Sequence, residues 1–97
     1  MIQSFKDEGT QNIYNGQKTK AARSICPESI WKIAVRKLDL LDSAEILRDL
    51  QIPPGYRLEH LSGDRQGQHS IRINDRFRVC FFWTINGPDQ VEIVDYH

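Results

Sequence analysis

Apolar residues recur at helical spacing in the middle of the chain, and charged residues lie between them. The apolar positions are Ile30, Ala34, Leu38 and Leu41. Steps of three and four residues place such side chains in one stripe along a helix, which is the face that packs against a core. Pro27 suits a first helical turn, and Glu28 lies where the positive end of the helix dipole favours an acid. The pattern predicts an amphipathic helix that begins near Pro27.

Weaker patterns lie on both sides of this helix. Residues 44–50 are rich in helix formers and predict a second short helix, capped by Asp42 or Ser43. Another short helix is expected within residues 7–16. Residues 1–5 are expected to form a short edge strand.

The apolar period changes to two after the sequence Ile52-Pro53-Pro54-Gly55, which a helix cannot cross. Alternation predicts four strands, at Tyr56–Leu61, Gln68–Asn74, Phe77–Trp83 and Val91–Tyr96. Turns rich in turn-forming residues are expected at 62–67, 74–76 and 85–89. Helices followed by strands indicate an α+β fold, in which an antiparallel sheet carries helices on one face. A length of 97 residues predicts a single domain over residues 1–97.

The composition excludes several classes of protein. A hydrophobic fraction of 39% and a charged fraction of 27% are typical of a globular chain, and zero net charge gives no bulk attraction to a polyanion. No segment approaches membrane-spanning length, and the N-terminus lacks the apolar stretch of a signal peptide. Cys26 and Cys80 lack metal-ligand spacing, so we expect two buried free thiols in a reducing compartment. The cytoplasm is the expected location.

The type of cation is more informative than the net charge. Eight of the thirteen cations are arginine, and six of the eight fall in one stretch: Arg48, Arg57, Arg65, Arg72, Arg76 and Arg78. Guanidinium groups bind phosphate and carboxylate through paired donors, so local clustering matters even in a neutral chain. Arg57, Arg65 and Arg76 are expected in strands and loops next to Arg72 and Arg78. Such a grouping favours an external polyanion as the ligand.

Strand pairing brings two of these arginines together. A three-residue loop at 74–76 keeps the apolar rows of both neighbouring strands on one side, and it places Arg72 directly opposite Arg78. Like charges in that position destabilise a sheet unless an anion lies beside them. The anion is either a carboxylate of the protein, with Glu92 and Asp95 as candidates, or an external phosphate. In the remaining alternative both arginines spread over a solvated face.

The residues Asp95-Tyr96-His97 follow an apolar strand and bring together a carboxylate, a phenol and an imidazole. Imidazole exchanges protons near neutral pH, tyrosine can donate a hydrogen bond to phosphate, and aspartate can orient either group. Alternatively, Tyr96 packs against the helices and His97 extends into solvent. His60 and His69 are further candidates, although alternation points His69 toward the core. Three scattered histidines lack the spacing of a metal site, so no metal is expected.

Eight segments in order carry a resemblance to a known family: Met1–Phe5, Arg36–Asp42, Leu47–Leu50 with the Pro-Pro-Gly turn, Arg57–Glu59, Leu61–Arg65, Gly67–Asn74, Phe77–Phe81 and Val91–His97. The chain resembles the HigB-type toxins of the RelE/ParE superfamily over almost its whole length. The resemblance implies a curved antiparallel sheet with helices on one face. It also implies cleavage of mRNA in the ribosomal A site without a metal or other cofactor, which inhibits translation and growth.

The resemblance also implies roles for particular residues. The active-site arginines of the family match Arg72 and Arg78, and its terminal catalytic residues match Asp95, Tyr96 and His97. The RNA 2′-hydroxyl is the nucleophile and a cyclic phosphate is left. The arginines would neutralise the phosphorane, Tyr96 or His97 would assist proton transfer, and Asp95 would orient them.

Other expectations concern binding. The expected RNA-binding residues are Arg57, Arg65, His69 and Arg76. The family implies a helix-turn-helix antitoxin, similar to HigA, which inhibits the toxin and contacts operator DNA. Ser62 replaces a lysine found in several relatives, and the chain lacks the strong basic charge of some ribonucleases of the superfamily, so slower cleavage is expected. Two alternatives remain: a ParE-like inhibitor that binds DNA gyrase without catalysis, and an inactive protein that only binds its antitoxin.

Overall fold

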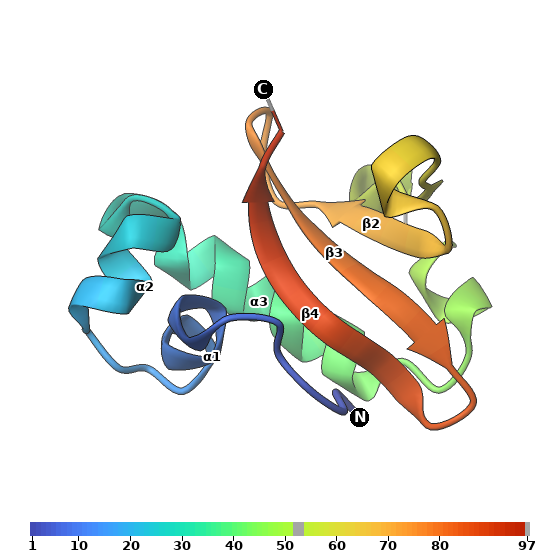
Figure 1. Cartoon of the computed structure of the whole chain (residues 1–97), viewed down its shortest axis with the longest axis horizontal. Helices are drawn as coiled ribbons and strands as arrows, with labels where there is room; N and C mark the ends of the chain where they lie inside the picture. Colours follow the sequence, from blue (N-terminus) through green and yellow to red (C-terminus); the bar gives the residue numbers. More distant parts are fainter. Residues whose placement is uncertain (52–53, 97) are drawn as a thin grey trace.

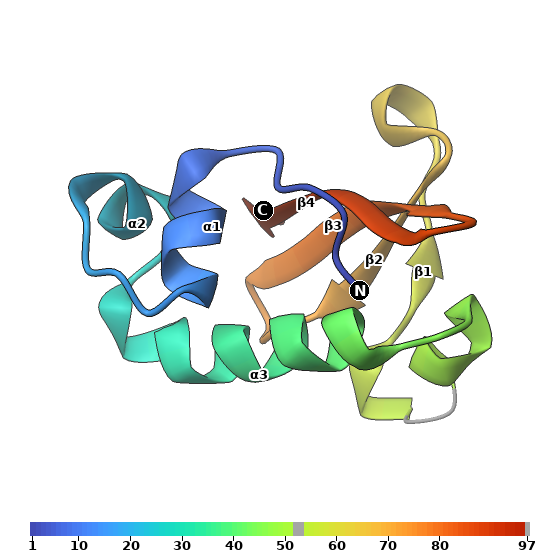
Figure 2. The same cartoon turned by 90° about the horizontal axis from the view of Figure 1, so that it is seen from below.

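The computed structural model describes residues 1–51 and 54–96. Its helices are α1 (Glu8–Tyr14), α2 (Lys20–Ile25) and α3 (Trp31–Ser43), and its strands are β1 (Glu59–His60), β2 (Gln68–Arg72), β3 (Phe77–Thr84) and β4 (Gly87–Asp95). The strands form one antiparallel sheet in the order β1-β2-β3-β4, with β3 and β4 as its long curved pair (Figure 1). Figure 2 shows α3 running along one side of the sheet, with α1 and α2 at one end of it. The predicted α+β fold is confirmed.

Within the described residues, four short 3-10 turns connect these elements, at Glu28–Ile30, Leu47–Leu50, Pro54–Tyr56 and Gly63–Arg65.

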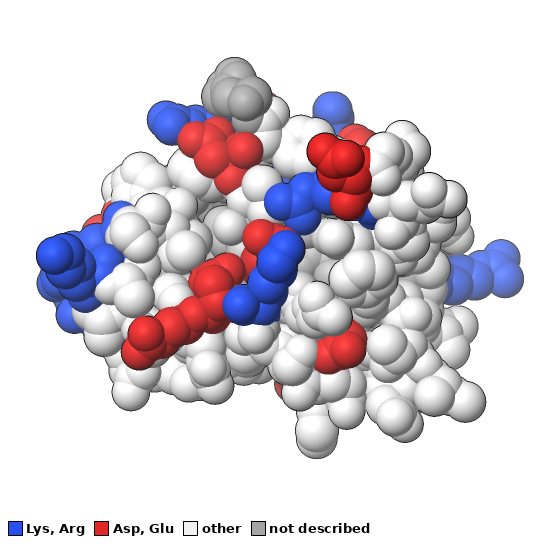
Figure 3. Space-filling model, in the orientation of Figure 1, with Lys and Arg blue, Asp and Glu red and all other residues white. Residues whose placement is uncertain are grey.

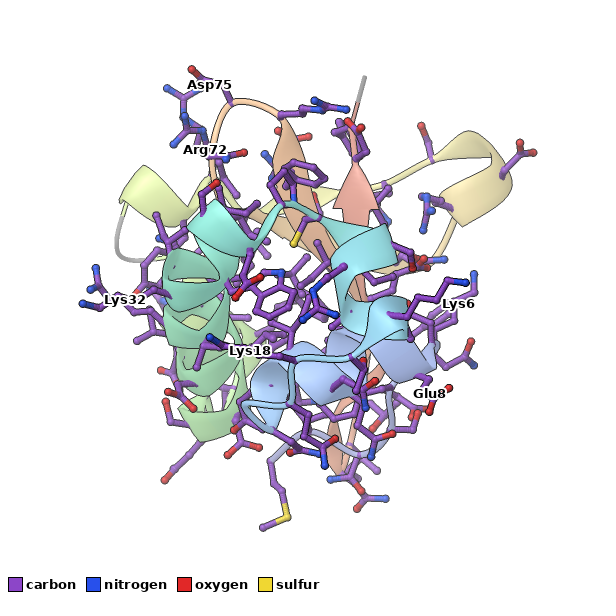
Figure 4. All side chains as sticks on the ribbon, turned by 90° about the vertical axis from the view of Figure 1, so that its left-hand side faces the viewer. Lys6, Glu8, Lys18, Lys32, Arg72 and Asp75 are labelled. Carbon is purple, nitrogen blue, oxygen red and sulfur yellow. The ribbon has the colours of Figure 1, made fainter. Side chains whose placement is uncertain are left out.

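The amphipathic pattern of α3 is confirmed. Ala34, Leu38 and Leu41 are fully buried and belong to the core that α3 forms with the sheet. Lys32 extends from the outer side of α3, away from the sheet (Figure 4). Ile30 lies just outside the α-helix, because the helical segment starts as a 3-10 turn at Glu28–Ile30 and becomes α-helical only at Trp31.

The register of β2 and β3 follows from the side-chain alternation. Ile71 pairs with Val79, and both side chains are fully buried on the helix side of the sheet. Arg72 pairs with Arg78 on the opposite face, as predicted. A shift by one residue would exchange the two faces, so burial of the apolar row fixes the position of the arginines.

Residues 1–5 do not form the predicted strand. Phe5 makes one parallel bridge to Val91, flanked by hydrogen bonds from the Val91 N–H to the Ser4 carbonyl (3.0 Å) and from the Lys6 N–H to the Val91 carbonyl (2.9 Å). The pairing stops there because Asp7 caps α1 directly afterwards, accepting the Thr10 N–H at 2.6 Å. The segment therefore covers the edge of β4 without extending the sheet.

The predicted helix over residues 44–50 is wrong. Ala44 is extended and ends α3, and only the 3-10 turn Leu47–Leu50 follows. The Asp49 carboxylate accepts the N–H groups of Glu45 (2.9 Å) and Ile46 (3.2 Å), so the segment is held from its far end rather than by a cap at Asp42 or Ser43.

Other boundaries also differ from the sequence prediction. The helix expected within residues 7–16 is α1, whereas α2, capped by Thr19, was not predicted. The first strand is shorter than expected, because Pro54–Tyr56 forms a 3-10 turn. The last strand begins earlier, at Gly87, and pairs with β3 across Ile85 and Asn86. Ile52 and Pro53 lie outside the described residues.

Helix α1 is tied to both of its neighbours. The hydroxyl of the fully buried Thr10 accepts the Ile93 N–H at 3.1 Å and joins α1 to β4. On the other side Gly9 lies so close to α2 that a Cβ there would meet the Ile25 side chain and lie 2.5 Å from the Ala21 carbonyl oxygen. The absence of a side chain at Gly9 sets the distance between α1 and α2.

We expect Gly9→Ala to lower the free energy of unfolding by about 1–3 kcal/mol, because overpacking outweighs the gain of about 1 kcal/mol in helix propensity. Urea unfolding measures the change. Gln11→Ala on the exposed side of the same helix is the matched control and should alter stability by less than about 0.5 kcal/mol. Unchanged or increased stability of Gly9→Ala would contradict this packing.

Candidate functional site

An open depression lies at the end of β4, on the sheet face that points away from the helices. Its volume is about 360 Å³, and its lining residues are Ser62, Asp64, Arg65, Val94, Asp95 and Tyr96. Val94 pairs with Arg78 and alternates with the buried Ile93, which places Val94 and Arg78 on this face. The depression thus brings the end of β4 together with the turn at Gly63–Arg65.

Arg78, the strand partner of the lining residue Val94, lies beside this depression with only 7% of its surface exposed. Its Nε donates to the Ser70 hydroxyl at 2.7 Å, and its Nη2 donates to the carbonyls of Arg57 (2.5 Å) and Ser70 (3.3 Å). Its Nη1 lies 3.6 Å from the Glu59 carboxylate. The Tyr96 ring covers the group, with its centroid 5.6 Å from the guanidinium carbon. Tyr96 therefore packs on Arg78 and not on the helices.

Arg72 is neutralised separately from Arg78. It forms an ion pair with Asp75 in the hairpin loop, and Figure 4 shows the two side chains together at the tip of the β2–β3 hairpin. The predicted opposition of like charges is therefore real, but the carboxylates that relieve it are Asp75 and Glu59. The earlier candidates Glu92 and Asp95 pair with other cations.

Lys37 is a neighbour of Arg72 that the sequence analysis did not select. Burial lowers the pKa of Lys37, and the charges of Arg72 and Arg36 lower it further. Its ammonium lies 4.5 Å from the centroid of the Tyr56 ring. The charges of Lys37 and Arg72 thus act on one another. No sequence spacing links position 37 with position 72, so only the packing of α3 against the sheet reveals this interaction.

Arg65 joins the turn at Gly63–Arg65 to the sheet. Its Nη1 donates to Glu92 and Gln68, each at 3.1 Å, and Glu92 also pairs with Lys6 at 3.2 Å. Burial alone would lower the pKa of Arg65, but the hydrogen bond to Glu92 and the surrounding charges outweigh it and the pKa is raised. Arg65 is therefore held as a fixed cation at the depression.

Arg76 and Asp95 form the opposite rim. Both Nε and Nη2 of Arg76 donate to Asp95 Oδ2, at 2.9 and 2.7 Å, and the hydrogen bond to Asp95 raises the pKa of Arg76. The Tyr96 N–H donates to the Arg76 carbonyl at 2.7 Å, which fixes the main chain beneath the tyrosine ring. Asp95 thus binds Arg76, and its role in orienting Tyr96 and His97 stays a prediction. His97 lies outside the described residues.

His69 does not join the arginines. It pairs with Phe81 on the core side of the sheet, and its ring stacks on Phe81 (6.1 Å) and meets His60 edge-on (4.8 Å). The exposed Arg57 side chain belongs to a residue with φ of 46°, in the left-handed region that favours glycine. Its carbonyl, rather than its guanidinium, contacts Arg78.

The two cysteines are buried free thiols, as predicted. Burial raises the pKa of Cys26 to about 11 and also raises that of Cys80, so neither thiol is activated. No three His, Cys, Asp or Glu side chains within residues 1–51 and 54–96 gather as metal ligands would. Across the same residues, no helix has the length and apolarity to cross a membrane.

The charges on this side of the molecule alternate. Figure 3 shows acidic and basic side chains interspersed over the visible face, without a continuous basic patch. Arg65, Arg72, Arg76 and Arg78 each lie beside a carboxylate. The site is a set of paired guanidinium groups around an exposed tyrosine, on an α+β scaffold. Guanidinium groups bind phosphate as well as carboxylate.

Comparison with known proteins identifies the scaffold. A family model described as the RelE-like toxin of the type II toxin–antitoxin system HigB matches residues 3–97. Toxin HigB-1 of Vibrio cholerae serotype O1 is 41% identical over 83 residues, which cover 86% of this chain and 84% of that protein. An uncharacterised protein of Haemophilus influenzae is 30% identical over 82 residues, or 84% of this chain and 78% of that protein.

The chain therefore belongs to the HigB-like family of RelE-like toxins. It is a type II toxin, and a type II system pairs a toxin with an antitoxin, so an antitoxin is its partner.

The position of His69 predicts how stability depends on pH. Burial, followed by the charge of His60, lowers the pKa of His69 below its ordinary value of 6.5. Between the lowered pKa and 6.5 the unfolded chain binds more protons than the folded protein, so the free energy of unfolding decreases as the pH falls through 6.5. We expect His69→Phe to reduce this decrease, measured by urea unfolding between about pH 5 and pH 8.

His60→Gln is the matched variant, because it removes only the smaller of the two causes and should reduce the pH dependence in part. Equal pH dependence in the wild type and in His69→Phe would refute the assignment.

Proposed function

We propose that this toxin is a ribosome-dependent endoribonuclease that cleaves mRNA and thereby inhibits translation and growth. The observation that carries the proposal is the Arg78 guanidinium, held beneath the exposed Tyr96 ring at the edge of a depression. A tyrosine face can stack on a base, and a fixed guanidinium beside it can bind the adjoining phosphate. Membership of the HigB-like family supports the same activity.

The proposed chemistry needs no metal. The RNA 2′-hydroxyl attacks the neighbouring phosphorus, the bond to the 5′-oxygen of the next nucleotide breaks, and a cyclic phosphate remains. Arg78 and Arg72 stabilise the charge of the phosphorane, because cations already fixed in place require no reorganisation during the reaction. The 2′-hydroxyl gives up its proton as it attacks, and the departing 5′-oxygen takes one up. Tyr96 or His97 assists this proton transfer, and Asp95, which binds Arg76, orients them.

Phosphates on either side of the cleaved bond contact Arg57, Arg65 and Arg76 in this proposal. Arg65 and Asp95 line the depression, and Arg76 binds Asp95 at its rim. His69 has no part in it, because its ring packs against Phe81 on the other side of the sheet.

We further propose that the antitoxin is a HigA-like helix-turn-helix protein and that operator DNA contacts the toxin only through it. The toxin would act in the cytoplasm, where ribosomes translate mRNA. Residues 1–97 would fold as one domain.

Purified toxin incubated with programmed ribosomes should yield cleaved mRNA that ends in a cyclic phosphate. Arg78→Gln should lower the cleavage rate by about 10²–10³, the range typical for loss of one preorganised donor to a developing anion. Tyr96→Phe tests the hydroxyl and keeps the ring over Arg78. Primer extension and end-group analysis measure both effects.

Arg48→Ala is the matched control, because Arg48 is exposed in the turn Leu47–Leu50. This variant should cleave mRNA at the wild-type rate. Intact mRNA with a toxin that still arrests growth would refute the proposal. A supercoiling assay would then test the gyrase alternative.

A further inference from the structure

The Arg78 guanidinium has two edges with different partners. The inner edge, formed by Nε and Nη2, donates to three neutral oxygens: the Ser70 hydroxyl, the Ser70 carbonyl and the Arg57 carbonyl. The outer edge, formed by Nη1, faces the Glu59 carboxylate at 3.6 Å. A guanidinium has five N–H donors, so partners on one edge leave the other available to an anion.

The inner edge is fixed by its surroundings. Ser70 is fully buried in β2, where it pairs with Glu59 on one side and Cys80 on the other. Arg57 adopts a left-handed backbone (φ 46°), which a residue with a side chain keeps only when its surroundings hold it. This conformation goes together with a 2.5 Å hydrogen bond from Arg78 Nη2 to the Arg57 carbonyl. These contacts set the orientation of the guanidinium.

The outer edge is held loosely by comparison. Glu59 belongs to β1, which is two residues long and lies at the edge of the sheet. Its side chain is 52% exposed, and its 3.6 Å separation from Nη1 is longer than a hydrogen bond. Because Glu59 is half exposed, water and salt screen its attraction to Arg78, and the contact contributes less than a short charged hydrogen bond would. A phosphate can make shorter, charge-assisted hydrogen bonds with the same nitrogen.

We propose that Glu59 is a resident counter-ion that occupies the RNA phosphate site of Arg78, and that Ser70 and the Arg57 main chain are positioning groups for this exchange. The identity of the anion rests on the proposed function. The Tyr96 ring favours RNA over an acidic peptide, because it lies 5.6 Å from the same guanidinium, is 45% exposed, and can stack on the base beside the bound phosphate.

The first test is Glu59→Gln, with a short single-stranded RNA that carries 2′-O-methyl groups and cannot be cleaved. Fluorescence anisotropy measures its dissociation constant. Removal of the competing carboxylate should tighten binding by about two- to fivefold, the range expected for loss of one ion pair whose carboxylate is exposed. Inorganic phosphate, followed through the Arg78 Nε–H resonance, should bind more tightly as well.

Glu45→Gln is the charge-matched control, because Glu45 is an exposed residue of the segment after α3 and its replacement changes the net charge equally. It should leave the affinity for RNA unchanged. If both variants bind RNA more tightly by the same factor, the effect comes from net charge alone and the proposal is overturned. Unchanged or weaker RNA binding by Glu59→Gln would overturn it as well.

A double-mutant cycle tests whether Glu59 acts through Arg78. The effect of Glu59→Gln on RNA affinity should disappear when Arg78 is replaced by glutamine, because the carboxylate then has no guanidinium to occupy. An undiminished effect in the Arg78→Gln background would overturn the proposal. Thermal unfolding establishes that each variant is folded.

Ser70→Ala tests the positioning role. It should weaken RNA binding and expose the Arg78 Nε–H to rapid solvent exchange, and Ser70→Thr, which keeps the hydroxyl, should restore both. A folded Ser70→Ala variant with wild-type affinity and a protected Nε–H would overturn this part.

These binding measurements need no catalysis. If wild-type toxin leaves mRNA intact, the proposed function fails, and the anion exchange at Arg78 is still judged separately.

Discussion

A buried guanidinium is the constraint on which the rest of the site depends. Arg78 lies in β3, an inner strand of the sheet, with 7% of its surface exposed. Its charge cannot be removed by deprotonation. An unpaired charge at such a position would be severely destabilising. The chain therefore has to supply oxygen acceptors, and it does so from Ser70, Arg57 and Glu59. The short strand β1 and the residues just before it thus supply two of these acceptors.

The sheet is consequently built as two chemically different faces. On the helix side, Ile71, Val79 and Phe81 pack against α3 in an apolar core. On the other side, cross-strand pairing aligns Glu59, Ser70, Cys80 and Glu92 in one row. Arg72, Arg78 and Val94 form the neighbouring row. Carboxylates at both ends of the first row bind the arginines beside them, which explains how clustered arginines and a neutral net charge occur together.

The parts of this arrangement that follow from periodicity could be predicted from the sequence. The opposition of Arg72 and Arg78 required only a period of two and an odd loop length, and the buried face of α3 required only helical spacing. The partners of the arginines were out of reach, because Glu59 lies in a two-residue strand and Asp75 in a loop. The hydrogen bond from the Glu45 N–H to Asp49 and the contact of Lys37 with Tyr56 likewise depend on three-dimensional packing.

The pairing of four arginines with carboxylates also determines how such a site can recognise a polyanion. A strongly basic surface attracts nucleic acid from a distance and releases many condensed cations on binding, so its affinity falls steeply with salt. In this chain Asp75 pairs with Arg72 and Glu59 with Arg78. Under the proposed exchange, these side chains are the anions that RNA displaces at short range. Recognition would then depend on the geometry of the guanidinium groups and on the Tyr96 ring more than on net charge. A neutral toxin of this design would ignore most nucleic acid and select RNA that a partner surface, such as the ribosome, presents to it in the right position.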